Sequence, residues 1–110
     1  MSSIEQLFQN LRRSLLEYCV IKILQEGEAY PAHVVQGLAE AEIHVAEGTV
    51  YPLLTRLKND GFLTYRWEES SYGPPRKYYK LTEKGLALAA QYEQAWNKLK
   101  NAVDKINTRY

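Results

Sequence analysis

Two short segments of this 110-residue chain carry side chains that can hydrogen-bond to phosphate groups and to the edges of nucleic-acid bases. They are EGTVYPLLTRLKNDGF, over residues 47–62, and GPPRKYYKL, over residues 73–81. An Arg side chain can donate two parallel hydrogen bonds to one guanine, whereas Lys supplies a point charge that suits a phosphate. Residues 70–80 hold three basic side chains and no acidic one, so this segment can approach a phosphate without repelling it.

Charge is distributed unevenly along the sequence, although the whole chain has a net charge of only +1. Residues 1–48 hold three basic residues and seven glutamates, a net charge of −4. Residues 49–110 hold eleven basic and six acidic residues, a net charge of +5. The basic half therefore contains nearly all of both segments, which favours an anionic partner.

The first segment has the periodicity of an amphipathic helix that ends at Gly61. Its apolar stripe, at spacings i, i+3, i+4 and i+7, consists of Val50, Leu53, Leu54 and Leu57. The opposite face and its flanks carry Gly48, Thr49, Tyr51, Pro52, Thr55, Arg56, Lys58 and Asn59. A proline is tolerated only in the first turn of a helix, so we expect the helix to begin near Thr49 or to kink at Pro52.

The second segment is predicted to form a hairpin with the residues that precede it. Alternating polarity predicts a strand over residues 63–68, with Leu63, Tyr65 and Trp67 on one buried face. Residues 69–75 are expected to form the turn and to keep both prolines outside the ladder. The return strand is expected over residues 76–81.

The rest of the chain is predicted to be helical. Apolar spacing without internal proline or glycine predicts one long helix over residues 4–26, stopped by Gly27. Pro31 suits the first position of a second helix that runs to Glu40, and residues 41–45 make the turn to the third. Thr82 followed by an acidic residue is typical of an N-cap, from which a last helix runs to about Asn107.

This order of elements predicts a mainly α fold with a small β-hairpin, namely a winged helix-turn-helix followed by one long helix. We assign residues 1–81 to the winged helix-turn-helix domain and residues 82–110 to a C-terminal dimerisation helix. The length of the chain suits one compact core.

The last helix carries apolar residues at the alternating spacing of a coiled-coil seam, namely Tyr92, Trp96, Leu99, Val103 and Ile106. Packing against the same domain is the commoner fate of such a face. However, amphipathic helices at both ends of a short chain would expose more apolar surface than a monomer usually tolerates. We therefore expect a homodimer built from both terminal helices.

Several functional classes are disfavoured by what the sequence lacks. No apolar run approaches the length of a membrane span, and the N-terminus does not look like a signal peptide, so we expect a cytoplasmic protein. One cysteine, Cys19, with His33 and His44, gives too few ligands for a structural metal site, and no cofactor motif is present. Without a catalytic constellation, an enzyme is not expected.

The chain resembles the PadR family of bacterial transcriptional regulators. The resemblance covers nearly the whole chain and rests on Tyr30 before the second helix, EGTVYPLLTRLKNDGFL over residues 47–63 and GPPRKYYKLTEKG over residues 73–85. We call the predicted hairpin over residues 63–81 the wing. With a single helix after the wing, the chain resembles the short PadR-like type.

The resemblance implies a dimer that binds a pseudo-palindromic operator in double-stranded DNA, usually as a repressor. The two third helices would enter successive major grooves about 34 Å apart. By position, the side chains that face bases or the adjoining backbone are Thr49, Tyr51, Pro52, Thr55 and Arg56, with Arg56 as a possible guanine reader. The expected phosphate contacts are Lys58, Arg76, Lys77 and Tyr78.

The resemblance also implies release of DNA by a small aromatic or cationic amphipathic effector that stacks on Trp96. The corresponding pocket walls are Leu11, Ser14, Tyr18 and Tyr92. Two alternatives stay open. In the first, Trp96 only fills the dimer seam, and the bulky Tyr18 and Tyr92 close the pocket. The domain as a whole could also serve protein–protein contact without binding DNA.

Overall fold

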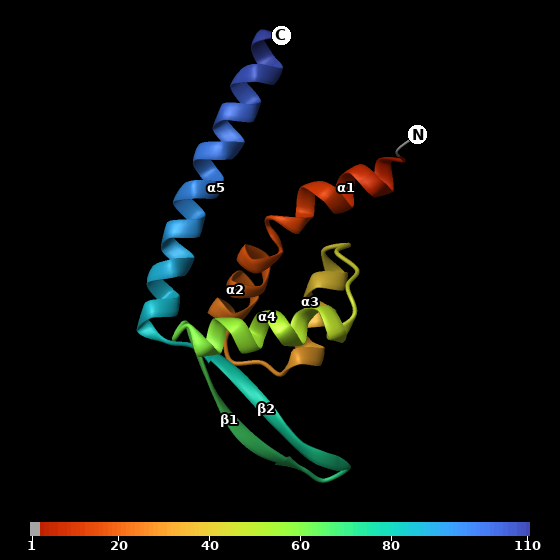
Figure 1. The fold of residues 1–110 in the computed structure, drawn as a ribbon, viewed down its shortest axis with the longest axis vertical. Helices are drawn as coiled ribbons and strands as arrows, with labels where there is room; N and C mark the ends of the chain where they lie inside the picture. The colour runs from red at the N-terminus through yellow and green to blue at the C-terminus, as the bar shows by residue number, and fades with distance from the viewer. Residues whose placement is uncertain (1–2) are drawn as a thin grey trace.

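The computed structural model describes residues 3–110, and its elements follow the predicted order (Figure 1). They are α1 (Ile4–Arg13), α2 (Leu16–Glu26), α3 (Pro31–Glu40), α4 (Glu47–Asn59), β1 (Leu63–Ser70), β2 (Gly73–Leu81) and α5 (Glu83–Arg109). The hairpin extends from one end of the helical body, and α1 and α5 extend from the other (Figure 1). The predicted fold class, mainly α with a two-stranded hairpin, is confirmed.

One hydrophobic core holds α2, α3, α4 and the base of the hairpin together. The apolar stripe of α4 faces it as predicted, because Val50, Leu54 and Leu57 are fully buried and Leu53 is half-buried. The other buried core residues are Val20, Ile21, Leu24, Ala29, Val34, Leu38, Leu63, Tyr79, Leu81 and Ala89. Burial of these apolar side chains fixes α4 with its polar face outward.

The single long first helix predicted over residues 4–26 is wrong, because the chain breaks into α1 and α2 at Ser14 and Leu15. The amide of Leu15 bonds to the carbonyl of Arg12 at 2.9 Å, which is a tightened last turn rather than an α-helical bond. The α1 helix buries no residue, so the core does not hold it in line with α2. Serine also favours helix ends over interiors, because its hydroxyl competes for backbone hydrogen bonds.

The helix α4 begins at Glu47, two residues before the predicted start, so Pro52 lies beyond the first turn. Pro52 and Gly48, whose carbonyl would have accepted the missing hydrogen bond, are both exposed. Water can therefore satisfy that carbonyl, and the cost of the proline is reduced. The helix ends as predicted, with Gly61 at a left-handed φ of 86° directly after the Asp60 cap.

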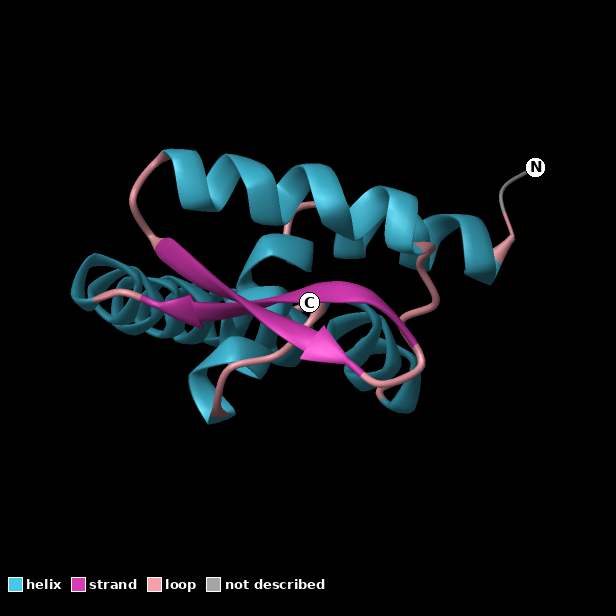
Figure 2. Cartoon of the chain, turned by 90° about the horizontal axis from the view of Figure 1, so that it is seen from below, coloured by secondary structure: helices cyan, strands magenta, loops and turns pink. Residues whose placement is uncertain are grey.

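The hairpin is longer than predicted on its second strand, because β2 begins at Gly73 and includes both prolines. The register pairs Trp67 with Lys77 and Glu68 with Arg76, and a bulge separates Glu68 from Ser70. The prolines are tolerated because the tip of this two-stranded sheet consists of edges only, where a missing N–H costs little (Figure 2). Lower along β2, Tyr79 exchanges backbone hydrogen bonds of 2.8 and 3.0 Å with Ala29.

The predicted buried face of the first strand is buried only at its base. Leu63 is 3% exposed and Tyr65 is half-buried, whereas Trp67 is 60% exposed. Strand alternation predicts which side chains share a face, but the face loses its cover where the hairpin extends beyond the helices. The expectation that Trp67 is buried is therefore corrected.

The last helix starts as predicted and ends two residues later, at Arg109. The Thr82 hydroxyl accepts a hydrogen bond of 3.1 Å from the amide of Gly85, which satisfies one free donor of the first turn. The backbone of Gly85 lies so close to the Phe62 carbonyl that an added Cβ would stand 2.1 Å from that oxygen. This close approach fixes where α5 leaves the core.

Candidate nucleic-acid interface

The outer face of α4 presents every side chain that the sequence predicted there. The predicted residues of this face are exposed, namely Thr49, Tyr51, Pro52, Thr55, Arg56 and Lys58. The buried stripe lies on the opposite side of the same helix. A helix with one face in the core and a polar opposite face can lie in the major groove of DNA.

The two flanks of α4 face different parts of the molecule. On one flank, the Lys58 ammonium lies 5.5 Å from the centre of the Tyr65 ring of β1, and Tyr51 borders the wing. On the other flank, Arg56 forms ion pairs with Glu17 of α2 and with Asp60. The wing therefore adjoins the flank of Tyr51 and Lys58, while Arg56 faces the helical body.

Arg56 belongs to a small polar cluster centred on the carboxylate of Glu17. That carboxylate accepts hydrogen bonds from the Arg56 guanidinium and from the Tyr92 hydroxyl of α5. Burial and then the bond to Glu17 raise the pKa of Tyr92 to about 12. The reading of a guanine by Arg56 stays a prediction, and it requires this side chain to leave Glu17.

On the wing face that points toward α4, Lys77 is held by aromatic rings. Its ammonium lies 4.5 Å from the centre of the Tyr65 ring and 5.2 Å from that of Trp67. Such cation–π contacts orient a cation without neutralising it. Lys77 and Lys58, which come from different elements, therefore approach the same tyrosine ring.

The opposite face of the wing contacts the segment between α2 and α3. Arg76 lies over the Tyr30 ring at 4.6 Å, and the same ring meets Tyr78 edge-on at 5.3 Å. Arg66 lies over Tyr78 and donates hydrogen bonds to Glu28, which lowers the pKa of that carboxyl. Of the two arginines, Arg66 anchors the wing, and Arg76 keeps its charge free of any carboxylate partner among residues 3–110.

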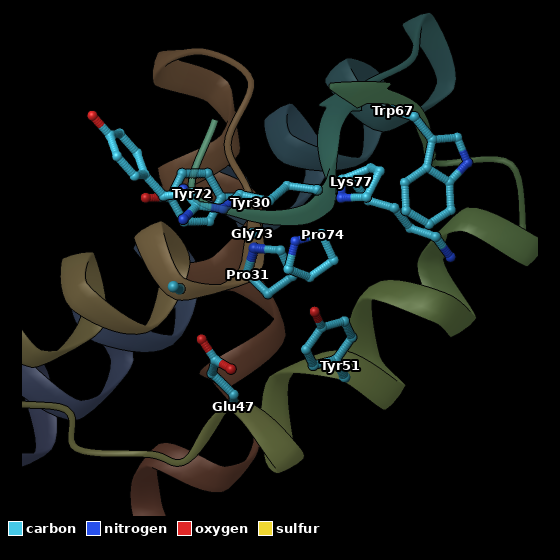
Figure 3. Close-up of a pocket in the computed structure, with 12 residues that line it drawn as sticks. Tyr30, Pro31, Glu47, Tyr51, Trp67, Tyr72, Gly73, Pro74 and Lys77 are labelled. Atoms are coloured by element: carbon cyan, nitrogen blue, oxygen red, sulfur yellow. The ribbon is translucent and has the colours of Figure 1, made fainter. Parts of the chain in front are cut away.

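A cleft of about 600 Å³ separates α4 from the wing (Figure 3). Its walls include predicted contacts, such as Tyr51, Arg76 and Lys77, and residues that the sequence analysis did not assign to the interface. The unassigned ones include Tyr30, Glu47, Trp67 and Tyr72. Trp67 could have been found from its strand position, because a matched register places it directly opposite Lys77.

The residues predicted to surround an effector are only partly brought together within one chain. Tyr18 and Tyr92 stack with ring centres 5.5 Å apart. Leu11 and Ser14 are exposed at the end of α1, and Trp96 is half-buried on α5.

Among the described residues, no helix is long and apolar enough to cross a membrane.

Three helices pack around one core, and the third of them turns a polar face outward beside a hairpin. This arrangement defines a winged helix-turn-helix protein. The sequence profile of the Transcriptional regulator PadR-like family matches residues 20–91. The chain belongs to this family of transcriptional regulators, as its motifs predicted, and the family does not consist of enzymes.

Solved structures of other family members share the architecture. A PadR-like transcription factor from Bacteroides fragilis is 48% identical, with 91% of this chain and 97% of that chain covered and a TM-score of 0.77. A PadR family regulator from Eggerthella lenta is 34% identical over 94% and 90% of the two chains, with a TM-score of 0.85. Bacillus subtilis PadR, solved in complex with operator DNA, is 23% identical over 71% and 45% of the chains, with a TM-score of 0.66.

Proposed function

We propose that this chain is a sequence-specific DNA-binding regulator that binds a pseudo-palindromic operator as a homodimer in the cytoplasm. The observation that carries this proposal is that the exposed outer face of α4 lies beside two wing cations, the exposed Arg76 and the half-buried Lys77. The operator complex of Bacillus subtilis PadR supports DNA as the ligand of this fold.

In the proposed complex, α4 lies in the major groove and the wing follows the adjoining backbone. Base edges and nearby backbone are contacted by Thr49, Tyr51, Pro52, Thr55 and Arg56. Phosphates are contacted by Lys58, Arg76, Lys77 and Tyr78. The wing residues supply affinity, and the α4 residues supply sequence preference.

The homodimer is proposed from the apolar side chains that α5 and α1 leave exposed. Leu99, Val103 and Ile106 are 54%, 46% and 58% exposed along one side of α5. The exposed apolar side chains of α1 are Ile4, Leu7, Phe8 and Leu11. Residues 82–110 would then form the dimerisation helix and residues 1–81 the DNA-binding domain. In the dimer, the exposed apolar side chains of α5 and α1 in one chain would cover those of the other chain.

We further propose that the regulator is a repressor and that a small planar aromatic compound releases it from DNA. The support for such a site is the stacked pair Tyr18 and Tyr92, one helical turn before Trp96 on α5. Leu11 and Ser14 would border it at the dimer interface. In the competing explanation, Trp96 only fills the seam, and planar aromatics then leave its fluorescence unchanged.

The DNA proposal is tested by titrating a labelled duplex from the region upstream of the chain's own gene at several salt concentrations. The logarithm of the affinity should fall linearly with the logarithm of the salt concentration, by about 0.9 per phosphate contacted. Absent or salt-independent binding would favour the alternative function, a winged helix that contacts only another protein.

The double substitution Arg76→Ala with Lys77→Ala should weaken binding to operator and unrelated duplexes by the same factor. It should also reduce the salt slope by about 1 to 2, because up to two phosphate contacts are lost. Lys98→Ala with Lys100→Ala removes the same charge from α5 and serves as the matched control. Equal affinity of the wing variant and the control would contradict the wing assignment.

A further inference from the structure

The cleft between α4 and the wing combines aromatic walls with cations on one side (Figure 3). Figure 3 shows Tyr51 pointing from α4 toward the wing, with Pro74 and Lys77 facing it and Trp67 beyond Lys77. The lining residues come from the start of α3, from α4 and from both strands. The cleft is thus bounded by the elements that the proposed function assigns to DNA.

The aromatic side chains of the cleft are more exposed than their size favours. Trp67 is 60% exposed and Tyr72, at the hairpin tip, is 99% exposed. Large aromatic side chains contribute strongly to binding when they lose contact with water. Tyr51 belongs to α4 and Trp67 to β1, where it lies next to Lys77, so a ligand that covers both rings also meets the positive charge of Lys77.

Lys77 lines the cleft, and Lys58, which is not part of its lining, approaches the same aromatic ring at the junction of α4 and the wing. The ammonium groups of Lys58 and Lys77 lie 5.5 and 4.5 Å from the centre of the same Tyr65 ring. No carboxylate within residues 3–110 pairs with either lysine. Their positive charges are therefore available to phosphate groups, and the shared ring holds both lysines at fixed positions.

We propose that this cleft receives one sugar–phosphate strand of the DNA, at the point where the duplex passes from α4 to the wing. The inference rests on the proposed function and adds a role for Trp67, which that function leaves unassigned. Trp67 and Tyr51 contact the deoxyribose rings, and Lys58 and Lys77 neutralise adjacent phosphates. Trp67 acts on affinity without reading bases, because every nucleotide presents the same sugar.

A strand of DNA fits the cleft better than a small neutral molecule does. The cleft is lined by Tyr51, which also belongs to the exposed outer face of α4, so an occupant there adjoins the proposed groove contact. Its cations, Arg76 and Lys77, lie on the wing side, and its acidic residue, Glu47, lies at the start of α4 (Figure 3). This separation of charge orients an anionic strand along the wing side of the cleft.

The direct test follows the two tryptophans of the full chain by ¹⁹F NMR after labelling with 5-fluorotryptophan. Trp67→Phe assigns the two resonances, and anisotropy of the labelled duplex reports binding in the same samples. Addition of duplex should shift the Trp67 resonance and reduce its solvent isotope effect. If the duplex binds and the Trp67 resonance keeps its position and solvent access, this inference is wrong while the proposed function stands. If no duplex binds, both are wrong.

Affinity measurements provide a second test. Trp67→Ala should weaken binding about fivefold or more, by the same factor for operator and unrelated duplexes, because the exposed ring no longer covers the sugars. Trp67→Tyr should recover most of that loss, because a ring remains to cover the sugar. Tyr110→Ala, which removes an exposed aromatic side chain just after α5, far from the wing, is the matched control.

The substitution Glu47→Gln should change the affinity for DNA in the opposite direction from Trp67→Ala. It removes a negative charge from the cleft and should tighten binding about twofold, the size expected for one exposed charge. Unchanged or weaker binding by this variant would contradict a phosphate strand in the cleft. Loss of sequence preference in Trp67→Ala would contradict the sugar contact, because that contact is the same at every base pair.

Discussion

Glu17 is a residue through which α4 meets α5. Its carboxylate pairs with Arg56 of α4 and accepts a hydrogen bond from Tyr92 of α5. A change in the position of α5 would therefore move Tyr92 relative to Glu17 and alter how strongly Glu17 holds Arg56. If Arg56 reads a base in the complex, Glu17 must release it, and part of the binding free energy goes into breaking this pair.

The raised pKa of Tyr92, about 12 against an ordinary value of 10.0, gives a prediction for stability. Because the folded state favours the protonated phenol, its contribution is fully present below pH 10 and is lost as the pH rises toward 12. The free energy of unfolding should fall over this range in the parent chain and fall less in Tyr92→Phe. Denaturant titrations of both proteins at about pH 9 and 11.5 measure the difference, and parallel losses would contradict the assignment.

The residues of this cluster could not be paired from the sequence alone. Glu17 and Arg56 are 39 positions apart, and Glu17 and Tyr92 are 75 apart, so no helical or strand period relates them. The outer face of α4, by contrast, was predictable in full, because one helical period relates all its members. The helical period therefore predicted the candidate contact residues. It could not predict that one of them, Arg56, forms an ion pair with Glu17 of the same chain.

Among the elements, the joint between the wing and α5 is the most tightly constrained. The Thr82 hydroxyl both caps α5 and donates a hydrogen bond of 2.7 Å to the Gly61 carbonyl, so it also ties α5 to the end of α4. Gly85 contacts the Phe62 carbonyl so closely that no side chain fits there. The direction of α5 is therefore set by backbone contacts as well as by its apolar face.

Gly85→Ala should lower the free energy of unfolding by about 2–4 kcal/mol, because the new Cβ displaces backbone that cannot move freely. Gly48→Ala is the matched control, since its Cβ would meet nothing within 4 Å. In the exposed first turn of α4, that change should stabilise by about 0.4–1 kcal/mol. Denaturant unfolding measures both, and a Gly85→Ala protein as stable as the parent would disprove the close contact.

The element boundaries show where local reasoning stops being sufficient. Neither proline nor glycine marks the break at Ser14, and the missing core contact of α1 that contributes to it cannot be inferred from local spacing. The exposure of Trp67 was missed because alternation fixes the face of a side chain but not how far the helices cover the sheet. Both errors concern packing between elements rather than the elements themselves.

On the scale of the whole molecule, exposed apolar side chains are concentrated on the two helices that extend away from the wing (Figure 1). A chain of this size rarely leaves such a surface in water. The proposed dimer covers it and at the same time presents two α4 helices to one duplex. Operator affinity should then depend on the α5 seam, although α5 contacts no DNA.

Val103→Glu should convert the dimer into single chains that sediment separately, because a charge at the centre of a seam is costly to bury. Affinity for the two-half-site operator should fall by about 10² or more, while affinity for a single half-site changes little. Asn101→Glu adds the same charge on the opposite side of α5 and should leave the dimer intact. A Val103→Glu protein that still sediments as a dimer would place the interface elsewhere.

Because α5 is long, a small change in its direction at the end that contacts the core produces a large displacement of its far end. Its 27 residues span about 40 Å at 1.5 Å per residue, and its contacts with the core lie in its first three turns, at Gly85, Leu88, Ala89 and Tyr92. A tilt of about 5° at that end moves the far end by about 3.5 Å, close to the 3.4 Å rise of one base pair. In the proposed dimer, a difference of a few degrees in the direction of α5 thus changes the distance between the two α4 helices by about one base-pair step.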